Sequence, residues 1–242
     1  METIKNVTEY YDELYTISKE QRDFFSELAS EYPIPVKFLR VGCGTGLFEH
    51  QLAKDGADVT GIEEYQELIH SANLRRRTQL MSIHYFQMSA LDMTHFLGKG
   101  FYNIISSLEN RIVFMHDQTL IRKFFFDTRK MINENGTLVI SLYNYNMFNE
   151  KNPELPIRES IRTSMHSQIS RQPNEEWVLN QWVETGNGKL MPVYKNEKIY
   201  PLTAEEIDRY AKEAGYTDVR FYSSYDKSPF TGNEENVIAV IK

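Results

Sequence analysis

The stretch FLRVGCGTG, residues 38–46, decides the fold of this chain. It closes a short apolar run that starts at Val36, and a helical pattern from Leu47 to Lys54 follows it. A short apolar run ended by glycines is typical of a buried strand, so we expect a strand, a tight turn and a helix. The glycines permit close approach of a ligand to the backbone, and the start of the helix presents free N–H groups. The stretch alone therefore predicts only a strand end that a ligand can approach.

Short apolar runs and longer helical patterns alternate through most of the chain. The stop signal at residues 133–136 ends one helix, and Thr203 with Glu206 forms a capping box at the start of another. Strands that alternate with helices of ten or more residues predict βαβ units. Right-handed crossovers make these a doubly wound α/β fold, a mostly parallel sheet with helices on both faces. The expected strands are 36–41, 57–62, 83–87, 101–108, 137–143, 219–225 and 237–241, and the expected helices are 47–54, 65–76, 118–132 and 202–214.

Two segments lie outside this alternation. Residues 7–31 carry apolar and aromatic positions at helical spacing and predict helix up to Pro33. Residues 146–200 contain four prolines and both tryptophans, and three of their segments have the pattern of antiparallel strands. We interpret them as an insertion whose strands are 168–171, 177–184 and 190–194.

The charge of the chain argues against a nucleic-acid partner. The 242 residues carry a formal net charge of −7, whereas a surface that binds a phosphate backbone is rich in basic side chains. The local exception is Arg75-Arg76-Arg77, near the end of an expected helix. We interpret these arginines as a solvated helix end whose cations complement the helix dipole. An RNA contact and a partner surface are the alternatives.

Cysteine usage and hydropathy bound the class of protein. The single cysteine, Cys43, rules out an internal disulfide or a multi-cysteine zinc site and fits a reducing compartment. No segment approaches the roughly 18 apolar residues of a membrane span, and the first residues lack the pattern of a signal peptide. We therefore expect a cytoplasmic protein with one large domain and an insertion, no metal site and no membrane partner. The oligomeric state cannot be read from the sequence.

An acid follows the second expected strand. Glu63 lies directly after Ile62, about twenty residues past the glycines, where a carboxylate can accept hydrogen bonds from both ribose hydroxyls of a nucleoside cofactor. The alternative is an exposed acid near the start of the next helix. A dinucleotide-binding loop needs a third glycine where this chain has Leu47, which disfavours a nicotinamide cofactor.

Several stretches, in order, resemble the motifs of class I S-adenosylmethionine-dependent methyltransferases. The resemblance covers residues 36–145 and 200–242, and it includes the closing helix and hairpin. The stretches are FLRVGCGTG at 38–46, VTGIE at 59–63, FYNIISSLE at 101–109 and MINENGTLVI at 131–140.

This resemblance implies a seven-stranded, Rossmann-like sheet and S-adenosyl-L-methionine as cofactor. It also implies that Gly42, Cys43, Gly44 and Gly46 contact the methionine part of the cofactor and that Glu63 binds the ribose. Ser89 and Ala90, with Asp92 as the alternative, would contact the adenine. Ser107 and Leu108 would lie under the sulfonium.

Two positions depart from the family pattern. Family members carry an acid where this chain has Arg40, and an aspartate where it has Tyr102. A cation at position 40 would repel a sulfonium and an ammonium unless it turns away or pairs with an acid. Arg40 therefore motivates a second hypothesis, a degenerate cofactor-binding module that regulates without methyl transfer.

The candidate residues for binding the methyl acceptor are aromatic and amide side chains. Tyr11 lies on the N-terminal helix, and such helices close over the site in small-molecule members. Asn144 and Tyr145 resemble a pair found in glycine- and sarcosine-type N-methyltransferases. Trp177 and Trp182 fit either an aromatic cage or buried packing.

We therefore expect a methyltransferase of a small-molecule acceptor, with N-methylation favoured over O-methylation and an RNA acceptor as the less favoured alternative. No catalytic residue is assigned, because alignment and desolvation can supply most of the rate. His116 is a candidate base, and the alternative for it is a residue at a helix start. The chain divides into an N-terminal helical cap (1–35), a cofactor-binding core (36–145), a β-rich insertion over the substrate site (146–200) and a C-terminal helix and hairpin that complete the sheet (201–242).

Overall fold

A computed structural model describes residues 4–76 and 82–242. Its centre is a seven-stranded sheet with the order β10-β11-β5-β4-β1-β2-β3. Neighbouring strands from β1 to β5 are parallel, and β11 runs antiparallel to both β5 and β10. The expected doubly wound, mostly parallel seven-stranded fold is therefore confirmed. The strands are β1 (Lys37–Val41), β2 (Asp58–Glu63), β3 (Ile83–Gln87), β4 (Tyr102–Ser107), β5 (Ile132–Tyr143), β10 (Val219–Tyr222) and β11 (Asn236–Ile241).

Helices cover both faces of this sheet. Successive side chains of a strand point to opposite faces, and Phe38 and Leu39 on β1 accordingly belong to two different apolar cores. Both faces are buried, as a parallel sheet requires. One core takes side chains from α3 (Lys19–Ala29), α4 (Leu47–Lys54) and α5 (Gln66–Arg76), and the other from α6 (Met93–Phe96), α7 (Gln118–Met131) and α8 (Ala204–Glu213).

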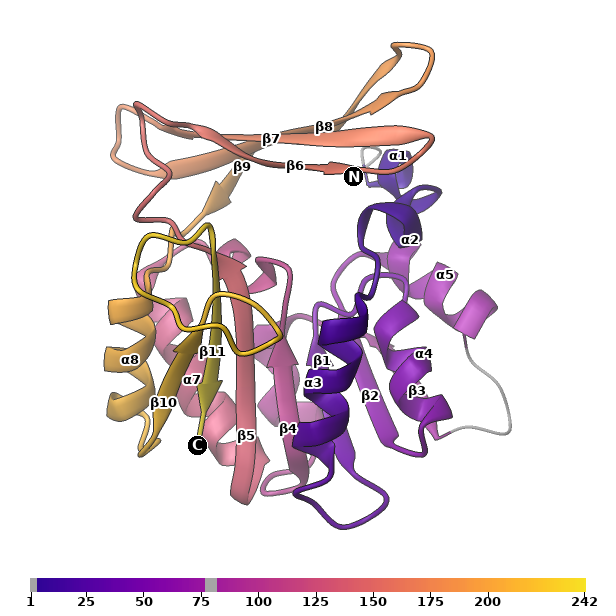
Figure 1. Cartoon of the computed structure of the whole chain (residues 1–242), viewed down its shortest axis with the longest axis vertical. Coiled ribbons are helices and arrows are strands. Elements are labelled where there is room, and N and C mark those ends of the chain that lie inside the picture. Colours follow the sequence, from indigo (N-terminus) through magenta and orange to yellow (C-terminus); the bar gives the residue numbers. More distant parts are fainter. Residues whose placement is uncertain (1–3, 77–81) are drawn as a thin grey trace.

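The N-terminal segment differs from the single helix that the sequence predicts. Instead of one helix over 7–31, the chain forms α1 (Lys5–Thr8), α2 (Tyr11–Leu14) and α3. Tyr15 leaves the helical conformation, with ψ at 59°, and the Ser18 side chain then caps α3 by accepting a hydrogen bond from the Gln21 N–H. This break lets α1 and α2 lie against the second sheet while α3 packs on the core (Figure 1).

The insertion is a four-stranded antiparallel sheet, which we call the upper sheet. It consists of β6 (Glu154–Glu159), β7 (Thr163–Arg171), β8 (Trp177–Thr185) and β9 (Leu190–Ile199), paired in that order. β6 was not expected, because Pro156 interrupts it. The proline is tolerated there because β6 is an edge strand whose register shifts between Leu155 and Arg158.

The upper sheet lies across the end of the core at which β1, β2 and β4 finish (Figure 1). Ligands of open α/β sheets bind outside these carboxyl ends. Two short 3₁₀ helices follow strands of the core, η1 (Ala90–Asp92) after β3 and η2 (Arg111–Phe114) after β4, and η2 contacts β5 of the core and β9 of the upper sheet. No helix in the described ranges is long and apolar enough to cross a membrane.

Candidate functional site

The glycine loop joins β1 to α4. Gly42, Gly44 and Gly46 have φ values of 76°, 58° and 76°, a left-handed conformation that side chains disfavour. The loop is tied to β2, because the Gly42 and Cys43 N–H groups both donate to the Ile62 carbonyl oxygen, at 2.9 and 3.0 Å. The glycines are therefore required by the backbone itself.

Two side chains cover the loop. A Cβ on Gly42 would lie 2.7 Å from Cγ of Arg111, and one on Gly44 would overlap the Tyr11 ring. The Arg111 guanidinium donates a hydrogen bond to the Tyr11 hydroxyl at 2.7 Å. Burial raises the pKa of Tyr11 well above its ordinary value, although the Arg111 cation opposes this. The loop is thus covered by a cationic side chain, Arg111, and by the neutral phenol of Tyr11.

Glu63 connects the loop to the β2–α5 turn. Its carboxylate is only 4% exposed and accepts from the Gly44 N–H at 3.0 Å and from the Glu64 N–H at 3.0 Å. The Tyr65 N–H donates to it as well, and the Arg111 guanidinium lies 3.9 Å away. A carboxylate has about four acceptor positions, so Glu63 keeps capacity for a ligand.

Beside the loop lies an open cavity of about 810 Å³, which we call the loop hollow. Four of the expected cofactor residues line it, namely Gly42, Glu63, Ser89 and Ala90. The other five are not in its wall: Tyr11 covers Gly44, Tyr85 packs on Gly46, and Cys43, Ser107 and Leu108 are buried. Wall residues that the sequence analysis did not assign to the cofactor include Glu64, Tyr65, Arg111, Phe114, His116 and Glu197.

The loop hollow is predominantly acidic. Glu63, Glu64 and Glu197 line it together with Arg111 and an exposed His116. Partial burial, and then the carboxylates of Glu63 and Glu197, raise the pKa of Glu64. A bound cation would relieve this repulsion. The hollow therefore suits a positively charged ligand.

Arg40 does not face the loop hollow. Its Nε lies 3.2 Å from Oε1 of Glu49 on α4, and the two side chains are 8% and 1% exposed. Burial raises the pKa of Glu49 to about 7, against the opposing effect of the Arg40 cation. Arg40 thus pairs with an acid, so its charge is not directed at the sulfonium and ammonium of the cofactor. The hypothesis of a degenerate module loses its motive.

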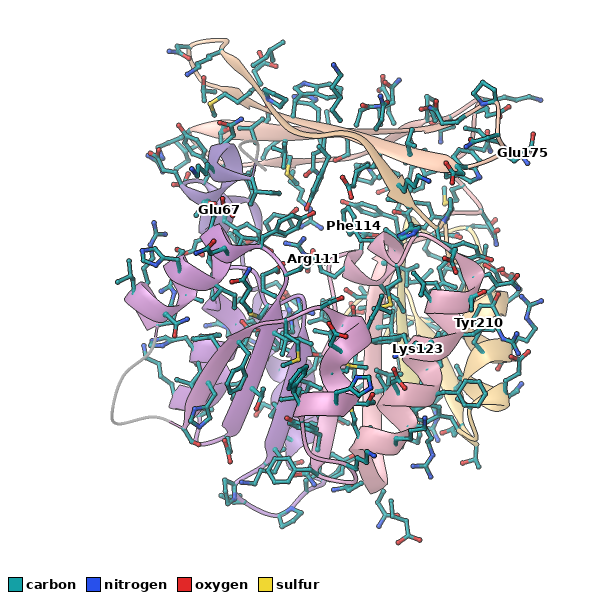
Figure 2. All side chains as sticks on the ribbon, turned by 180° about the vertical axis from the view of Figure 1, so that it is seen from behind. Glu67, Arg111, Phe114, Lys123, Glu175 and Tyr210 are labelled. Carbon is teal, nitrogen blue, oxygen red and sulfur yellow. The ribbon has the colours of Figure 1, made fainter. Side chains whose placement is uncertain are left out.

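A second cavity, of about 580 Å³, lies between the core and the upper sheet, and we call it the roofed cavity. Arg111 and Phe114 line both it and the loop hollow. Figure 2 shows these two residues between the core and the upper sheet. The two cavities therefore share η2 as part of their walls. The apolar wall includes Ile4, Val7, Leu155, Met165, Leu179 and Val193.

Of the expected acceptor residues, Tyr11 and Tyr145 line the roofed cavity. Asn144 does not; its buried amide donates to the carbonyl oxygens of Gly232 and Glu234, at 2.9 and 3.0 Å. Neither tryptophan lines the roofed cavity, and Trp182 stacks on His166 with ring centroids 5.5 Å apart.

The basic helix end has a structural role. Arg76 and Arg75 both pair with Asp12 of α2, Arg75 at 3.9 Å, and Arg77 lies outside the described residues. Within residues 4–76 and 82–242, no group of three or more His, Cys, Asp or Glu side chains is placed to hold a metal ion.

Comparison with known proteins identifies a methyltransferase domain in this chain. Residues 38–136 match the family model of a methyltransferase domain. A protein of Geobacillus sp. (strain WCH70), provisionally named a methyltransferase, is 24% identical over 85% of this chain and 84% of its own length. A ubiquinone biosynthesis O-methyltransferase of Pseudomonas savastanoi pv. phaseolicola is 29% identical, but over only 46% of this chain and 45% of that enzyme.

Solved structures share the whole fold. The CcbJ methyltransferase from Streptomyces caelestis superimposes with a TM-score of 0.78 at 16% identity, over 100% of this chain and 98% of that one. The sugar N-methyltransferase KedS8 from Streptoalloteichus sp. gives 0.67 at 16% identity, over 96% and 90%. These comparisons show a methyltransferase domain at residues 38–136, and over the whole chain they show the fold of solved S-adenosylmethionine-dependent methyltransferases.

Proposed function

We propose that the protein transfers the methyl group of S-adenosylmethionine to a nitrogen atom of a small molecule held in the roofed cavity. One observation carries the proposal: Arg111 and Phe114 line both the roofed cavity and the loop hollow, so the two cavities adjoin at η2. A donor in the loop hollow and an acceptor in the roofed cavity would therefore approach each other at η2.

The residues of the loop hollow fit the cofactor. Glu63 would accept from the ribose hydroxyls, since its backbone donors hold the carboxylate in place, and Ser89 and Ala90 would flank the adenine. Arg111 and Tyr11 cover Gly42 and Gly44, so the methionine part would meet these two side chains, with its carboxylate on the Arg111 guanidinium. The acidic wall suits the cationic sulfonium, which supplies an activated methyl group.

The protein's own contribution is alignment and exclusion of water. The upper sheet, α1 and α2 would enclose the acceptor, and Phe114, which lines both cavities, would lie between the two ligands. Fixing the acceptor beside the donor replaces a bimolecular encounter with an oriented one. Such a site needs no covalent intermediate.

A nitrogen acceptor is favoured by one side chain of the roofed cavity. Two arginines, Arg111 and Arg158, line it together with the acid Glu109, whose carboxylate would attract a cationic amine. An amine that has lost its proton attacks without a strong base, whereas an oxygen acceptor often needs one. The sugar N-methyltransferase neighbour agrees with nitrogen, and the ubiquinone O-methyltransferase relative keeps oxygen as the alternative.

Isothermal titration with S-adenosylmethionine and S-adenosylhomocysteine tests the cofactor. Glu63→Gln should weaken the binding of both by at least tenfold (about 1.4 kcal/mol). Glu67→Gln, in the first turn of α5 and outside the loop hollow, is the matched control. Transfer of a tritiated methyl group to a library of amines and alcohols tests the reaction. Absence of binding by either cofactor form would refute the proposal. Binding without transfer to any acceptor would instead support a regulatory module.

A further inference from the structure

Glu109 and Arg158 form an ion pair in the wall between two cavities. Glu109 follows β4, and Arg158 belongs to β6 of the upper sheet. Both line the roofed cavity, and both also line a groove of about 1070 Å³ on its other side, which we call the side groove. Asn110 and Tyr143 line the same two spaces. The pair is therefore accessible from the roofed cavity and from an open surface.

The backbone at Glu109 is held in an unfavourable conformation. Glu109 and Asn110 have φ values of 59° and 62°, which residues with a Cβ disfavour. Ser141 fixes them, since its hydroxyl accepts from the Glu109 N–H at 3.0 Å and its carbonyl oxygen from the Asn110 N–H at 3.1 Å. Strained, non-glycine residues of this kind concentrate at functional sites.

Each member of the pair depends on the other for charge balance. Among the described residues, Glu109 is the acid that the Arg158 guanidinium contacts. The guanidinium otherwise lies 4.5 Å over the Tyr15 ring, and its side chain is 22% exposed. Removing one partner would leave a partly buried charge without compensation.

This balance restricts which molecules can bind at the pair. A simple amine would add a second cation beside the single carboxylate of the pair, and a simple carboxylic acid would add a second anion beside its single guanidinium. A molecule that carries both charges compensates both residues. We propose that the methyl acceptor is an α-amino acid, with its ammonium on Glu109 and its carboxylate on Arg158; this rests on the function proposed above.

The rest of the roofed cavity fits an amino-acid side chain. Leu155, Leu179 and Val193 contribute apolar wall. Gln181, also in the wall, donates a 2.9 Å hydrogen bond to the Ser167 hydroxyl. An apolar side chain can pack against the leucine and valine side chains of this wall.

The reaction balances with the residues in place. The acceptor ammonium gives one proton to the Glu109 carboxylate, and the freed lone pair forms a C–N bond with the methyl carbon. The C–S bond breaks and its electrons stay on sulfur, which becomes a neutral thioether, while the nitrogen becomes a secondary ammonium. Glu109 returns its proton to water in the side groove.

The test uses the full chain and the twenty proteinogenic amino acids as acceptors in the tritiated methyl assay. Each accepted amino acid is compared with its decarboxylated amine and its deaminated acid. Arg158→Gln and Glu109→Gln are the variants. Arg162→Gln is the matched control, because Arg162 is an exposed arginine near the start of β7 that pairs with Glu13 outside both cavities. S-adenosylhomocysteine affinity is measured for every protein.

We expect at least one amino acid to be methylated with a kcat/KM at least tenfold above that of its amine. Arg158→Gln should raise KM for the amino acid at least tenfold and abolish this preference, with S-adenosylhomocysteine affinity unchanged. A pair that only fastens the upper sheet to the core would lower the unfolding midpoint and reduce both acceptors equally, which would overturn the inference. Cofactor binding without methylation of any amino acid would overturn it too, whereas absence of cofactor binding would refute the proposed function itself.

Discussion

Replacing Glu49 should destabilise the protein much more than replacing Arg40, although the two side chains form one buried ion pair. The pair is 8% and 1% exposed, with Nε and Oε1 3.2 Å apart. A guanidinium cannot release its proton in a protein, whereas a carboxyl group can bind one. Loss of Glu49 therefore leaves a permanent buried charge, and loss of Arg40 leaves a group that can neutralise itself.

The magnitudes follow from this difference. Glu49→Leu should cost about 3–5 kcal/mol of unfolding free energy, the usual effect of breaking a buried pair. In Arg40→Met, Glu49 can avoid a buried charge by binding a proton. Because its pKa is about 7, protonation at pH 8 costs the equivalent of about one pKa unit, or about 1–2 kcal/mol of unfolding free energy. The double variant, Arg40→Met with Glu49→Leu, should return close to the wild-type stability because no charge remains buried.

Urea unfolding at pH 8, followed by circular dichroism, measures all four proteins, and titration with S-adenosylhomocysteine measures the cofactor site. The reasoning is refuted if Arg40→Met costs as much as Glu49→Leu. It is also refuted if Arg40→Met changes cofactor affinity by more than about tenfold (roughly 1.4 kcal/mol) while the unfolding free energy stays unchanged. That second result would mean that Arg40 faces the loop hollow.

Three further predictions concern the loop and its surroundings. Arg111→Ala should weaken S-adenosylhomocysteine binding by at least about tenfold in calorimetry, because a charge-assisted hydrogen bond contributes about 1.5–3 kcal/mol, and an unchanged Kd would contradict the role of Arg111. Gly44→Ala should cost about 1–3 kcal/mol in urea unfolding, since Gly44 has φ 58° and an added Cβ would overlap Tyr11; Tyr11→Ala in the same chain should recover only the part that is due to overlap. The pKa of Glu49 is raised from 4.5 to about 7, so between these pH values the folded state holds a proton that the unfolded chain releases. The unfolding free energy should therefore fall by up to about 3 kcal/mol as pH rises from about 4.5 through 7. Glu49→Gln should flatten this dependence in urea unfolding, and equal slopes for the two proteins would contradict the prediction.

The fold could be predicted because its elements are specified locally. Each strand of the parallel sheet is a short apolar run, and each helix has its own end signals, such as the capping box of Thr203 and Glu206. The break between α2 and α3 was missed because helical spacing continues through Tyr15. A local signal was present in Ser18, which caps α3, and packing of α1 and α2 against the upper sheet completes the separation.

The site was predicted only where one segment carries it. Gly42 and Glu63 belong to contiguous motifs, and both line the loop hollow. Arg111, Glu197 and Arg158 belong to η2, β9 and β6, and nothing local in the sequence indicates that these elements meet. Asn144 shows the opposite case: an amide beside the expected acceptor position is used instead to hold the loop at Gly232 and Glu234.

Arg40 shows why a departure from a family pattern has to be judged together with its spatial partner. Glu49 lies in the first turn of α4 and is nearly fully buried there, so an acid at position 40 would place two carboxylates together. Repulsion and burial would then raise the pKa of both and destabilise the turn that carries the glycine loop. The family's acid and Glu49 are therefore incompatible, and Arg40→Asp alone would damage the site that it is meant to restore. The arginine is better understood as half of a compensated pair than as the loss of a cofactor-binding residue.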